Sequence, residues 1–521
     1  MNHRIVLIIS IAFLCEVSAN AANIFYVSPK GNDANDGKSA LHAWKTCAKV
    51  NAAAFQPGDS VLFERGGEWR EQLKVSSNGE SDKPIVYDAY GTGAKPRFLG
   101  SDIVTGFTSA GENKYSFKPA AKCDAVLENH VFIPSTWDKD RGLVTISLGS
   151  TDPRSNGKVY TCCVRGNVVF APGKKHIILR NLIADETAGQ LDEGTVQGYG
   201  IRIEGCTDVR LEDCEAYRCG RHHFGAINST GFVGRNLHAA YTQPDTPGGN
   251  SFYVSYADQN APVPKCTSEW YAISGDHLED GKNGYCIFFV SHGPNQGPIL
   301  IADSDIRAKC SLMSAPVVIK GGFVRENGSV ENMGKGILID GLTLLDNSAI
   351  DQWDSDGIIQ NCVAASNPTN NGPTGYSAAI LCRDNARHNV VRFNTLVTRR
   401  FTCLKVLAKD AGTQWYGNIM ITENSENVSL PDQSVGKADF NFYSTKPTIC
   451  GITLEAWTAK GFDTHSLSGD PKFRDAAKGD YHLQSGSPCI GAVKIETQDI
   501  PASDFTGKKR AEGRPADIGA F

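Results

Sequence analysis

The chain has 521 residues, 40% of them hydrophobic and 21% charged, and it contains 53 glycines. This composition excludes a disordered or collagen-like protein and indicates an ordered chain with many turns and enough apolar material for a core. Its 52 lysines and arginines against 57 aspartates and glutamates give a net charge of −5, which argues against nucleic acid or an anionic membrane as the partner.

Residues 1–22 have the features of a secretory signal. A short basic start at His3 and Arg4 is followed by an apolar stretch over 5–15 and by small residues at 19–21. The stretch is too short to span a membrane, and no later segment has about 18 uninterrupted apolar residues. We therefore expect a secreted or periplasmic protein without a membrane span.

Residues 23–100 differ in pattern from the rest of the chain. The segment 25–29 leads into a turn rich in Gly, Asn and Asp, and a helix is predicted over 44–54. A strand follows Pro57-Gly58-Asp59, and Gly66-Gly67 makes a second corner.

From about residue 176 to residue 422 one cadence repeats roughly every 20 to 35 residues. A short β-branched run alternates apolar with polar residues and then ends at Asn, Asp or Gly, as expected of a strand that buries one face and stops at a corner. Such runs occupy 176–181, 209–214, 232–237, 337–342, 358–362 and 390–394.

A coil of this length cannot bury its own apolar face, so it must stack on the coil before it. We therefore predict an all-β parallel β-helix over 101–465, with less regular insertions near 101–165 and 241–298. A β-sandwich or propeller is the alternative, but Asn-Gly hairpin signals between alternating runs are scarce. Long loops on a rigid solenoid usually line its binding face.

Of the 16 cysteines, 15 follow the predicted signal, an odd number that leaves at least one thiol unpaired. We favour buried free thiols over a disulfide framework, because several cysteines lie in or near apolar runs, where a thiol packs as a small hydrophobe. These are Cys206, Cys214, Cys362, Cys382 and Cys403.

Both ends of the chain resemble a known group of proteins. The opening Tyr-Val-Ser-Pro-x-Gly-x-Asp at 26–33 and Pro-Gly-Asp-x-Val at 57–61, with the closing segments 469–473, 480–483, 486–490 and 517–521, are similar to secreted right-handed parallel β-helix proteins of the pectate-lyase-like superfamily. The resemblance implies a right-handed β-helix. Residues 23–100 would form its N-terminal cap, with a capping helix, and its first coils, and residues 466–521 would form a C-terminal capping segment. It also implies a groove for several sugar units, because polysaccharide lyases, glycoside hydrolases and related epimerases dominate the superfamily.

Two neighbouring runs, 199–204 and 221–225, carry the first candidate site. Adjacent histidines on a strand point in opposite directions, so one of them should face outward near two outward charges of the preceding coil. A histidine with a carboxylate and an arginine has the parts for proton transfer, whereas the alternative is a histidine that fills a corner by bonding backbone carbonyls. We predict roles in catalysis for His222, His223 and Glu204 and in substrate binding for Tyr199, Arg202 and Arg221.

The second candidate site follows the run that ends at Ile350. A glycosidase needs two carboxyl groups, and an aromatic ring is a natural platform for a sugar face. We predict Asp351 and Glu204 as acid and base or nucleophile, with Trp353 binding the sugar. An ordinary Asx turn is the alternative for Asp354 and Asp356.

Metal sites have weaker signals. The segment 275–281, with His292 behind it, has acidic groups suited to Ca²⁺ but lacks the ligand spacing of a calcium loop, which favours a solvated turn. Cys206, Cys214 and Cys219 lack the paired spacing of a zinc site. The sequence therefore requires no cofactor, although Ca²⁺ stays open.

Cationic side chains on later runs are expected to bind acidic groups of the substrate. Lys320, Arg383 and Lys405 occupy positions that would continue an outward row on the same sheet, where they would suit uronate or sulfate groups. Isolated surface charges are the alternative.

The leading hypothesis is a secreted enzyme that cleaves glycosidic bonds of a polysaccharide or oligosaccharide in a groove along the solenoid. Hydrolysis is slightly favoured over β-elimination on a uronic-acid glycan, in which His223 or Lys320 would be the base and Arg202 or Arg221 would neutralise the carboxylate. A glycan-binding or adhesive protein without catalysis is a third alternative. We expect the chain to act as a monomer.

Overall fold

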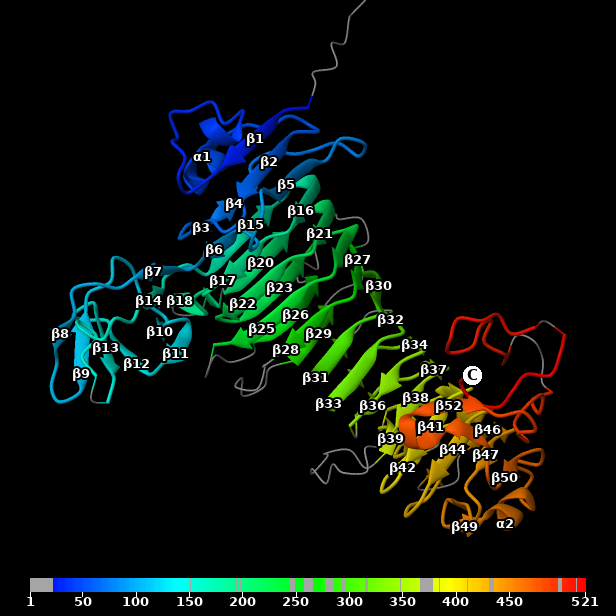
Figure 1. Cartoon of the computed structure of the whole chain (residues 1–521). Coiled ribbons are helices and arrows are strands. Elements are labelled where there is room, and N and C mark those ends of the chain that lie inside the picture. The colour runs from blue at the N-terminus through cyan, green and yellow to red at the C-terminus, as the bar shows by residue number, and fades with distance from the viewer. Residues whose placement is uncertain are drawn as a thin grey trace, which may run out of the picture.

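The chain folds as a parallel β-helix, as predicted, with a smaller β domain inserted near its N-terminal end (Figure 1). The computed structural model describes residues 22–149, 151–192, 195–196, 198–243, 249–256, 266–276, 285–291, 296–313, 317–346, 348–365, 378–383, 385–409, 411–430, 435–494, 499–511 and 513–521. The predicted signal thus lies, except for residue 22, outside the described residues and stays a prediction.

Each regular coil contributes one strand to each of three parallel ladders. Ladder I is a 14-stranded sheet. In order along the axis its strands are β1 (Ile24–Val27), β2 (Ser60–Glu64), β5 (Ile85–Tyr90), β16 (Lys175–Arg180), β21 (Thr207–Glu212), β24 (Phe232–Arg235), β27 (Cys266–Tyr271), β30 (Gln296–Ala302), β32 (Val317–Lys320), β34 (Leu338–Asp340), β37 (Ile358–Gln360), β40 (Val390–Arg392), β43 (Thr413–Tyr416) and β46 (Val435–Asp439).

Ladders II and III are joined through two long strands, β31 (Asp305–Met313) and β33 (Phe323–Asn332), whose first halves pair in ladder II and second halves in ladder III. The other strands of ladder II are β3 (Glu68–Trp69), β6 (Arg97–Leu99), β17 (Ile183–Asp185), β22 (Glu215–Cys219), β25 (His238–Thr242), β28 (Ser274–Asp276), β35 (Thr343–Leu344), β38 (Val363–Ala365), β41 (Thr395–Thr398), β44 (Ile419–Thr422), β47 (Phe442–Tyr443) and β50 (Leu467–Ser468). The other strands of ladder III are β4 (Leu73–Lys74), β15 (Asn167–Pro172), β20 (Tyr199–Glu204), β23 (His222–Ile227), β26 (Asn250–Tyr256), β29 (Tyr285–Ser291), β36 (Ala349–Gln352), β39 (Ala378–Cys382), β42 (Thr402–Val406), β45 (Val428–Ser429) and β48 (Thr448–Ile449).

One continuous apolar core fills the interior between the three ladders. Rings stack from coil to coil within it, as where Phe224 and Phe252 lie with centroids 5.3 Å apart. Because β26, β27, β28 and β29 are ladder strands, the second predicted insertion, 241–298, is largely part of the solenoid. Residues 244–248, 257–265, 277–284 and 292–295 lie outside the described residues.

Asparagines stack at one corner of the last coils. Asn394 Nδ2 donates to Asn418 Oδ1 at 2.9 Å, and Asn418 Nδ2 donates to Asn441 Oδ1 at 3.1 Å. The series ends where Asn441 Nδ2 donates to Asp463 Oδ1 at 2.9 Å. All four side chains are buried, so each amide satisfies a neighbour that water cannot reach.

Residues 101–165 leave the solenoid after β6 and form a separate β domain with its own core. Two four-stranded antiparallel sheets build it, in the orders β11-β10-β14-β7 and β12-β13-β9-β8. Their strands are β7 (Ser101–Ile103), β8 (Thr108–Ser109), β9 (Lys114–Phe117), β10 (Val126–Glu128), β11 (Val131–Ile133), β12 (Ser135–Asp138), β13 (Leu143–Ser147) and β14 (Tyr160–Cys163). The short hairpin of β18 (Gln190–Asp192) and β19 (Thr195–Val196) follows later, after ladder strand β17.

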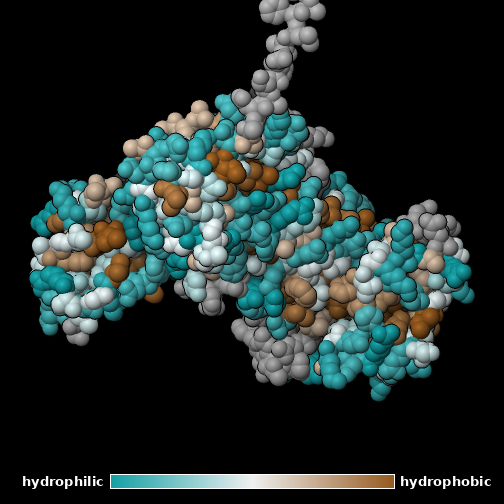
Figure 2. Space-filling model, turned by 45° about the horizontal axis from the view of Figure 1, so that its top comes forward, coloured by the Kyte–Doolittle hydropathy of each residue, from teal (hydrophilic) through white to brown (hydrophobic). Residues whose placement is uncertain are grey.

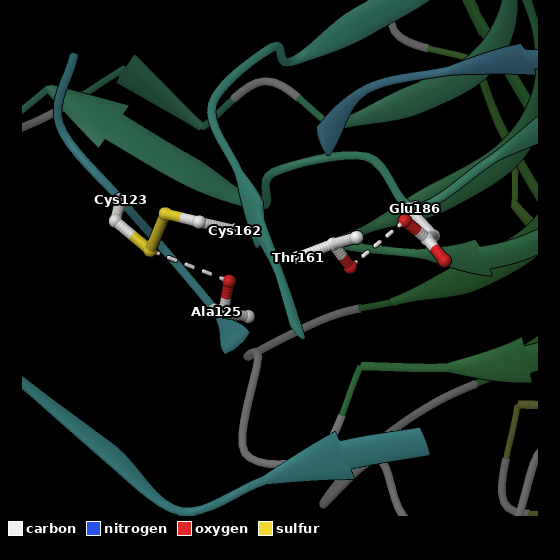
Figure 3. Close-up of a disulfide and its surroundings, with 5 residues drawn as sticks. All are labelled: Cys123, Ala125, Thr161, Cys162 and Glu186. Carbon is white, nitrogen blue, oxygen red and sulfur yellow. Dashed lines mark hydrogen bonds between the residues drawn. A yellow bond between two sulfur atoms is a disulfide. The ribbon is translucent and has the colours of Figure 1, made fainter. Parts of the chain in front are cut away.

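A disulfide joins Cys123 to Cys162 inside this domain (Figure 3). Thr161, next to Cys162, donates a hydrogen bond to Glu186 of the solenoid, so the disulfide-bonded strand also contacts the main body. Eleven further cysteines of the described chain are free, and all except Cys450 are buried. They include the five thiols that were predicted to pack in apolar runs.

The N-terminal helix is shorter than predicted: α1 spans Cys47–Ala52, after the short 3-10 helix η1 (Ala40–His42). Thr46 caps α1 by accepting a hydrogen bond from the backbone N–H of Lys49. Trp44, which precedes the helix, is buried against Phe25 with ring centroids 5.0 Å apart.

At the other end, α2 (Leu454–Thr458) follows β49 (Ile452–Thr453) and lies beside the last coils (Figure 1). Its Trp457 is buried and stacks on Trp415 of ladder I at 6.2 Å. The C-terminal segment contains β51 (Phe473–Asp475), η2 (Ala476–Lys478) and β52 (Asp480–Leu483). It was predicted to cap the end of the solenoid. It packs along the side of the coils, where Ala520 N–H donates to Thr395 Oγ1 at 3.0 Å.

The face of the molecule drawn in Figure 2 is mostly hydrophilic, with separate apolar patches on the inserted domain and on the solenoid. Within the described residues, no helix is long and apolar enough to cross a membrane.

Candidate active site on ladder III

Side chains on the outer face of ladder III form one row in register along the solenoid axis. Their neighbours in sequence, such as Ile203, Val330 and Ile350, are buried in the core, so the row residues point away from it. Matched residues on successive strands lie about 4.8 Å apart. We call this the outer row, and its members with described side-chain positions are Phe170, Arg202, Gly225, Tyr253, Ser311, Glu331, Asp351, Leu381 and Lys405, with one strand, β29, between those of Tyr253 and Ser311.

Two carboxylates are neighbours in this row. Glu331 of β33 and Asp351 of β36 occupy matched positions, and they are 6% and 0% exposed. Asp351 is held by Arg383, whose Nε donates to Oδ1 at 2.9 Å and whose Nη2 donates to Oδ2 at 2.9 Å. The Arg383 guanidinium lies over the Trp353 ring at 4.5 Å. We call Glu331, Asp351, Trp353 and Arg383 the carboxylate cluster.

The surroundings of Asp351 shift its titration upward. Burial raises its pKa above the ordinary value, and the charge of Glu331 acts in the same direction. Hydrogen bonds and charge from Arg383, and a hydrogen bond from Trp353, oppose this rise without cancelling it. Asp351 therefore keeps its proton to a higher pH than an exposed aspartate, as a general acid requires.

The outer surface of the cluster is formed by the two larger side chains. Trp353 is 37% exposed and the Arg383 side chain is 30% exposed, whereas both carboxylates are buried. An exposed ring beside a cation and two acids offers a sugar both a stacking face and charged hydrogen-bond partners.

A second group on the outer face of ladder III lies toward the N-terminal end. The His222 ring lies between Tyr199 and Tyr253, with centroid separations of 4.7 and 4.3 Å. The Arg202 guanidinium lies over the Tyr199 ring at 4.9 Å, and its Nη2 is 3.0 Å from Glu204 Oε2. We call Tyr199, His222, Tyr253, Arg202 and Glu204 the tyrosine–histidine stack.

The two predicted carboxylates do not form one site. Glu204 lies on β20 and Asp351 on β36, six strand intervals apart along ladder III, or roughly 29 Å at the spacing of paired strands. An acid and its partner in glycoside cleavage must be within about 10 Å. The prediction that Glu204 and Asp351 act on the same bond is therefore wrong.

The predicted histidines are both buried and neutral. His223 Nε2 lies 3.0 Å from the carbonyl oxygen of Ala240, and burial lowers the pKa of His223 to about 4. Burial and then the charge of Arg221 lower the pKa of His222 well below its ordinary value. His223 thus fills a corner, which was the alternative interpretation, and His222 lies on the outer side but is covered by tyrosines.

Lys320 belongs to a different face from the one predicted. It lies on β32 of ladder I, matched with Ala302 and Asp340, because alternation alone does not reveal to which ladder a run belongs. Arg383 and Lys405 do lie on the outer face of ladder III.

The other predicted acidic groups have simpler surroundings. Asp354 Oδ1 accepts a hydrogen bond from the Ser355 N–H at 2.7 Å, and Asp356 has a positive φ of 62° and pairs with Lys335 at 3.0 Å. Both therefore belong to a turn. Of the segment 275–281, residues 277–281 lie outside the described residues, as does His292.

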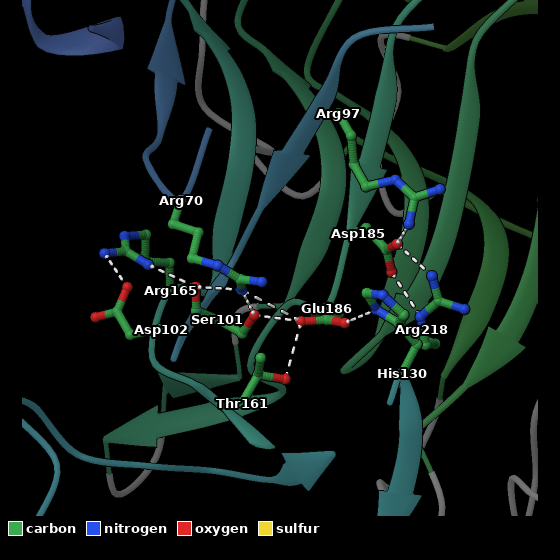
Figure 4. A network of polar contacts seen from close by, with 10 residues as sticks. All are labelled: Arg70, Arg97, Ser101, Asp102, His130, Thr161, Arg165, Asp185, Glu186 and Arg218. Carbon is green, nitrogen blue, oxygen red and sulfur yellow. Dashed lines mark hydrogen bonds and ion pairs between the residues drawn. The ribbon is translucent and has the colours of Figure 1, made fainter. Parts of the chain in front are cut away.

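A buried ionic network joins the inserted domain to the solenoid (Figure 4). Glu186 Oε1 lies 2.5 Å from His130 Nδ1, and its other oxygen accepts from Ser101. Asp185 accepts from Arg218 Nε at 2.9 Å and from Arg97 Nη1 at 3.2 Å. Sequence reasoning missed this network, because its members come from distant segments.

His130, Asp185 and Glu186 form the one group of metal-binding side chains whose ligand atoms lie within 4.8 Å of one another in the described chain. Arginines surround its carboxylates, and Arg70 Nη1 is 3.7 Å from Glu186 Oε2. Carboxylates already neutralised by guanidinium groups are poor ligands for Ca²⁺. The group is better explained as the contact that holds the inserted domain in place.

Comparison with known proteins supports the fold most clearly. No family model matches the sequence. Over 79 residues the chain is 42% identical to a lacto-N-biosidase of Bifidobacterium longum, a match that covers 14% of this chain and 5% of that protein. The chain thus spans about one twentieth of the length of this curated relative.

Among solved structures, XylC in complex with xylose aligns over 96% of this chain and 98% of its own, with a TM-score of 0.53 and 12% identity. A GH136 lacto-N-biosidase from Eubacterium ramulus aligns over 86% of this chain and 67% of its own, with a TM-score of 0.40 and 14% identity. The likeness to XylC extends over nearly all of both chains and shows a shared fold.

Proposed function

We propose that the protein is a glycan-degrading enzyme that cleaves glycosidic bonds at the carboxylate cluster. The observation that carries this proposal is the matched pair of Glu331 and Asp351, which lie on neighbouring strands at the outer face of the solenoid and are both buried. Most glycoside hydrolases use two carboxyl groups whose surroundings differ.

The surroundings of the pair suggest which residue does what. Asp351, whose pKa is raised by burial, is the proton donor to the leaving glycosidic oxygen. Glu331 attacks the anomeric carbon as nucleophile, or activates the water whose hydroxyl ends on that carbon. Because the matched backbones lie about 4.8 Å apart, the pair is nearer to the short separation of retaining enzymes.

The remaining members of the cluster bind the sugar. Trp353 offers its partly exposed ring as a platform, and Arg383 fixes both the ring and Asp351. The short stretch shared with a lacto-N-biosidase is in keeping with a glycan substrate. A secreted or periplasmic location, as the N-terminal sequence predicts, would give access to such substrates.

β-Elimination on a uronic-acid glycan is the second candidate. It is favoured by the cations of the same face, since Lys405 lies two strands beyond Asp351 in the outer row. In that reaction Lys405 would remove the proton next to the carboxylate and Arg383 would neutralise the uronate.

The test is turnover of neutral, uronic and sulfated polysaccharides by the purified protein, followed through new reducing ends and absorbance near 235 nm. Reducing ends without absorbance support hydrolysis, and both signals together support elimination. We expect Asp351→Asn and Glu331→Gln to abolish turnover without changing the urea midpoint by much.

Glu326→Gln is the matched control, because Glu326 lies on the same strand as Glu331 but between its two paired halves, with an exposed side chain. Equal turnover by Asp351→Asn and the wild-type protein would overturn the assignment of the cluster. A wild-type protein that binds glycans and cleaves none would indicate an adhesive protein.

A further inference from the structure

The two sides of the carboxylate cluster are chemically unlike. Along the solenoid axis Glu331 precedes Asp351 in the outer row, and the row continues in both directions. Toward the N-terminal coils Glu331 is matched with Ser311, a polar neighbour. Toward the C-terminal coils Asp351 is matched with Leu381, an apolar one. A substrate lying along the row therefore meets different groups at its two ends.

Ser311 has a buried hydroxyl without a partner. Its neighbours Cys310 and Leu312 belong to the core, so its side chain points to the outer face, where it is 1% exposed. Among the described residues, Ser311 Oγ has no hydrogen-bond partner. A buried hydroxyl that stays unpaired is costly, so a ligand group that pairs with it is bound favourably. A sugar ring held against Glu331 carries hydroxyls that can do so.

A second column of side chains follows the outer row, two residues further along each strand. Trp353, Arg383 and Leu407 come directly after β36, β39 and β42. They continue the ladder, as where the Leu407 N–H donates to Cys382 O at 2.7 Å. Leu407 thus lies two strand intervals beyond Trp353, or roughly 10 Å. It is 37% exposed and offers an aliphatic surface on the Asp351 side of the cluster.

The roles assigned to the two carboxyl groups give the substrate a direction. The nucleophile, or the activated water, approaches the anomeric carbon from the side opposite to the leaving oxygen, which the acid protonates. With Glu331 and Asp351 in these roles, the line from carbon to oxygen runs from β33 toward β36. The sugar that contributes the anomeric carbon then lies on the Ser311 side, and the leaving group lies on the Leu407 side.

We propose that Ser311 binds a hydroxyl of the sugar whose anomeric carbon is attacked, and that Leu407 packs against a sugar of the leaving group. The substrate thus runs along ladder III with its leaving group toward the C-terminal coils. This inference rests on the proposed function, because it takes the roles of Glu331 and Asp351 from it. Ser311 and Leu407 bind the substrate and take no part in proton transfer.

The test compares two substrates that share the attacked sugar. One is the oligosaccharide that the protein cleaves, and the other is the 4-nitrophenyl glycoside of the product that carries the new reducing end, whose leaving group is short. Leu407→Asp should lower kcat/KM for the oligosaccharide about tenfold relative to the 4-nitrophenyl glycoside, because an apolar contact with the leaving group is lost.

Ser311→Ala should lower kcat/KM about tenfold for both substrates and keep their ratio near one, since the lost hydrogen bond belongs to the sugar they share. Ser311→Thr, which keeps the hydroxyl, should recover part of the loss. Ser311→Ala should also raise the inhibition constant of the product with the new reducing end about tenfold.

Two control variants match these changes elsewhere on the solenoid. Leu467 of β50 is also 37% exposed, and Ser268 of β27 is also 1% exposed, with an Oγ that lacks a partner among the described residues. Leu467→Asp and Ser268→Ala should leave both kcat/KM values unchanged. The urea midpoint of each variant shows whether it is folded.

The direction would be overturned if a folded Ser311→Ala variant affected the oligosaccharide alone, or if Leu407→Asp reduced the turnover of both substrates equally. Wild-type turnover in both variants would overturn it as well. In each of these cases the wild-type protein still cleaves glycans, so the proposed function stands. A wild-type protein that cleaves no glycan would instead refute the proposed function, and with it the roles from which the direction is taken.

Discussion

Arg383 holds Asp351 with two guanidinium nitrogens, Nε at 2.9 and 3.0 Å from the two carboxylate oxygens and Nη2 at 2.9 Å from one of them. The same guanidinium covers the Trp353 ring at 4.5 Å. One side chain thus fixes both the proposed acid and the proposed sugar platform, so its loss should affect protonation and binding in separable ways.

Removing the guanidinium should raise the pKa of Asp351 further, because Arg383 supplies the largest effects that lower it. If Asp351 acts as the acid, the basic limb of the pH profile of kcat/KM reports its deprotonation. Arg383→Ala should therefore move this limb to higher pH and reduce kcat/KM by roughly 100-fold or more.

Arg383→Ala also leaves a buried carboxylate unpaired, which costs on the order of 3–5 kcal/mol. Arg383→Lys keeps the charge without the two-nitrogen geometry and should shift the basic limb less. Arg399→Ala, which removes an arginine paired with Glu423 on the surface, is the control. A basic limb that stays in place in both Arg383 variants would show that Asp351 is not the acid.

Trp353 is predicted to act in binding more than in chemistry. Trp353→Ala should raise KM about tenfold while kcat changes little, since a ring stacked on a sugar contributes to ground state and transition state alike. Trp353→Phe should recover most of the loss. Trp137→Ala, in the inserted domain, should have no effect, and a fall in kcat alone for Trp353→Ala would contradict the platform role.

Local patterns were sufficient to predict the solenoid. Alternation in runs such as 176–181 and 390–394, each ending at Asn, marks a strand with one buried face, and stacking follows from the repeat. The inserted β domain was recognised only as an irregular segment, because its short antiparallel strands pair across turns that leave little periodic signal. The side-on course of the C-terminal segment depends on distant contacts such as Ala520 with Thr395.

The candidate site was predictable only in part. Asp351 and Trp353 were found from composition, because carboxylates and a Trp gather after one run. Glu331 was missed, although it alternates with the buried Val330 and Asn332. The alternation of residues shows which side chains of a run face outward, but it does not show to which ladder the run belongs or where it lies along the axis. The prediction that Glu204 and Asp351 form one site was wrong for that reason.

The asparagine series should contribute strongly to the stability of the last coils. Asn418→Ala removes donors to Val391 O and to Asn441 Oδ1, and it removes the acceptor of the Asn394 N–H, all in buried positions. We expect the free energy of unfolding to fall by roughly 2–4 kcal/mol, measured by urea denaturation. Asn236→Ala, which loses one exposed bond to Asp213, should cost far less. Equal effects of the two substitutions would rule out a special role for the series.

The network beneath the inserted domain should make stability depend on pH. Burial raises the pKa of Asp185 to about 6, although Arg218 and Arg97 oppose the rise. The folded protein thus binds a proton more readily than the unfolded chain, whose aspartate titrates near pH 3.9. From about pH 4 to about pH 6 the Asp185 contribution to the free energy of unfolding should therefore decrease as pH rises, and it should be constant above.

Asp185→Asn should flatten this slope, which urea midpoints at pH 4, 5, 6 and 7 would measure, and Glu112→Gln at an exposed position should not. Glu186, whose pKa is lowered by its hydrogen bonds to Ser101 and His130 against burial, should act in the opposite sense and lose its contribution as pH falls below its ordinary range. Glu186→Gln should therefore remove stability at neutral pH and reduce the further loss on acidification. An unchanged slope in Asp185→Asn would mean that this carboxyl is ionised throughout the range, with its two arginines outweighing its burial.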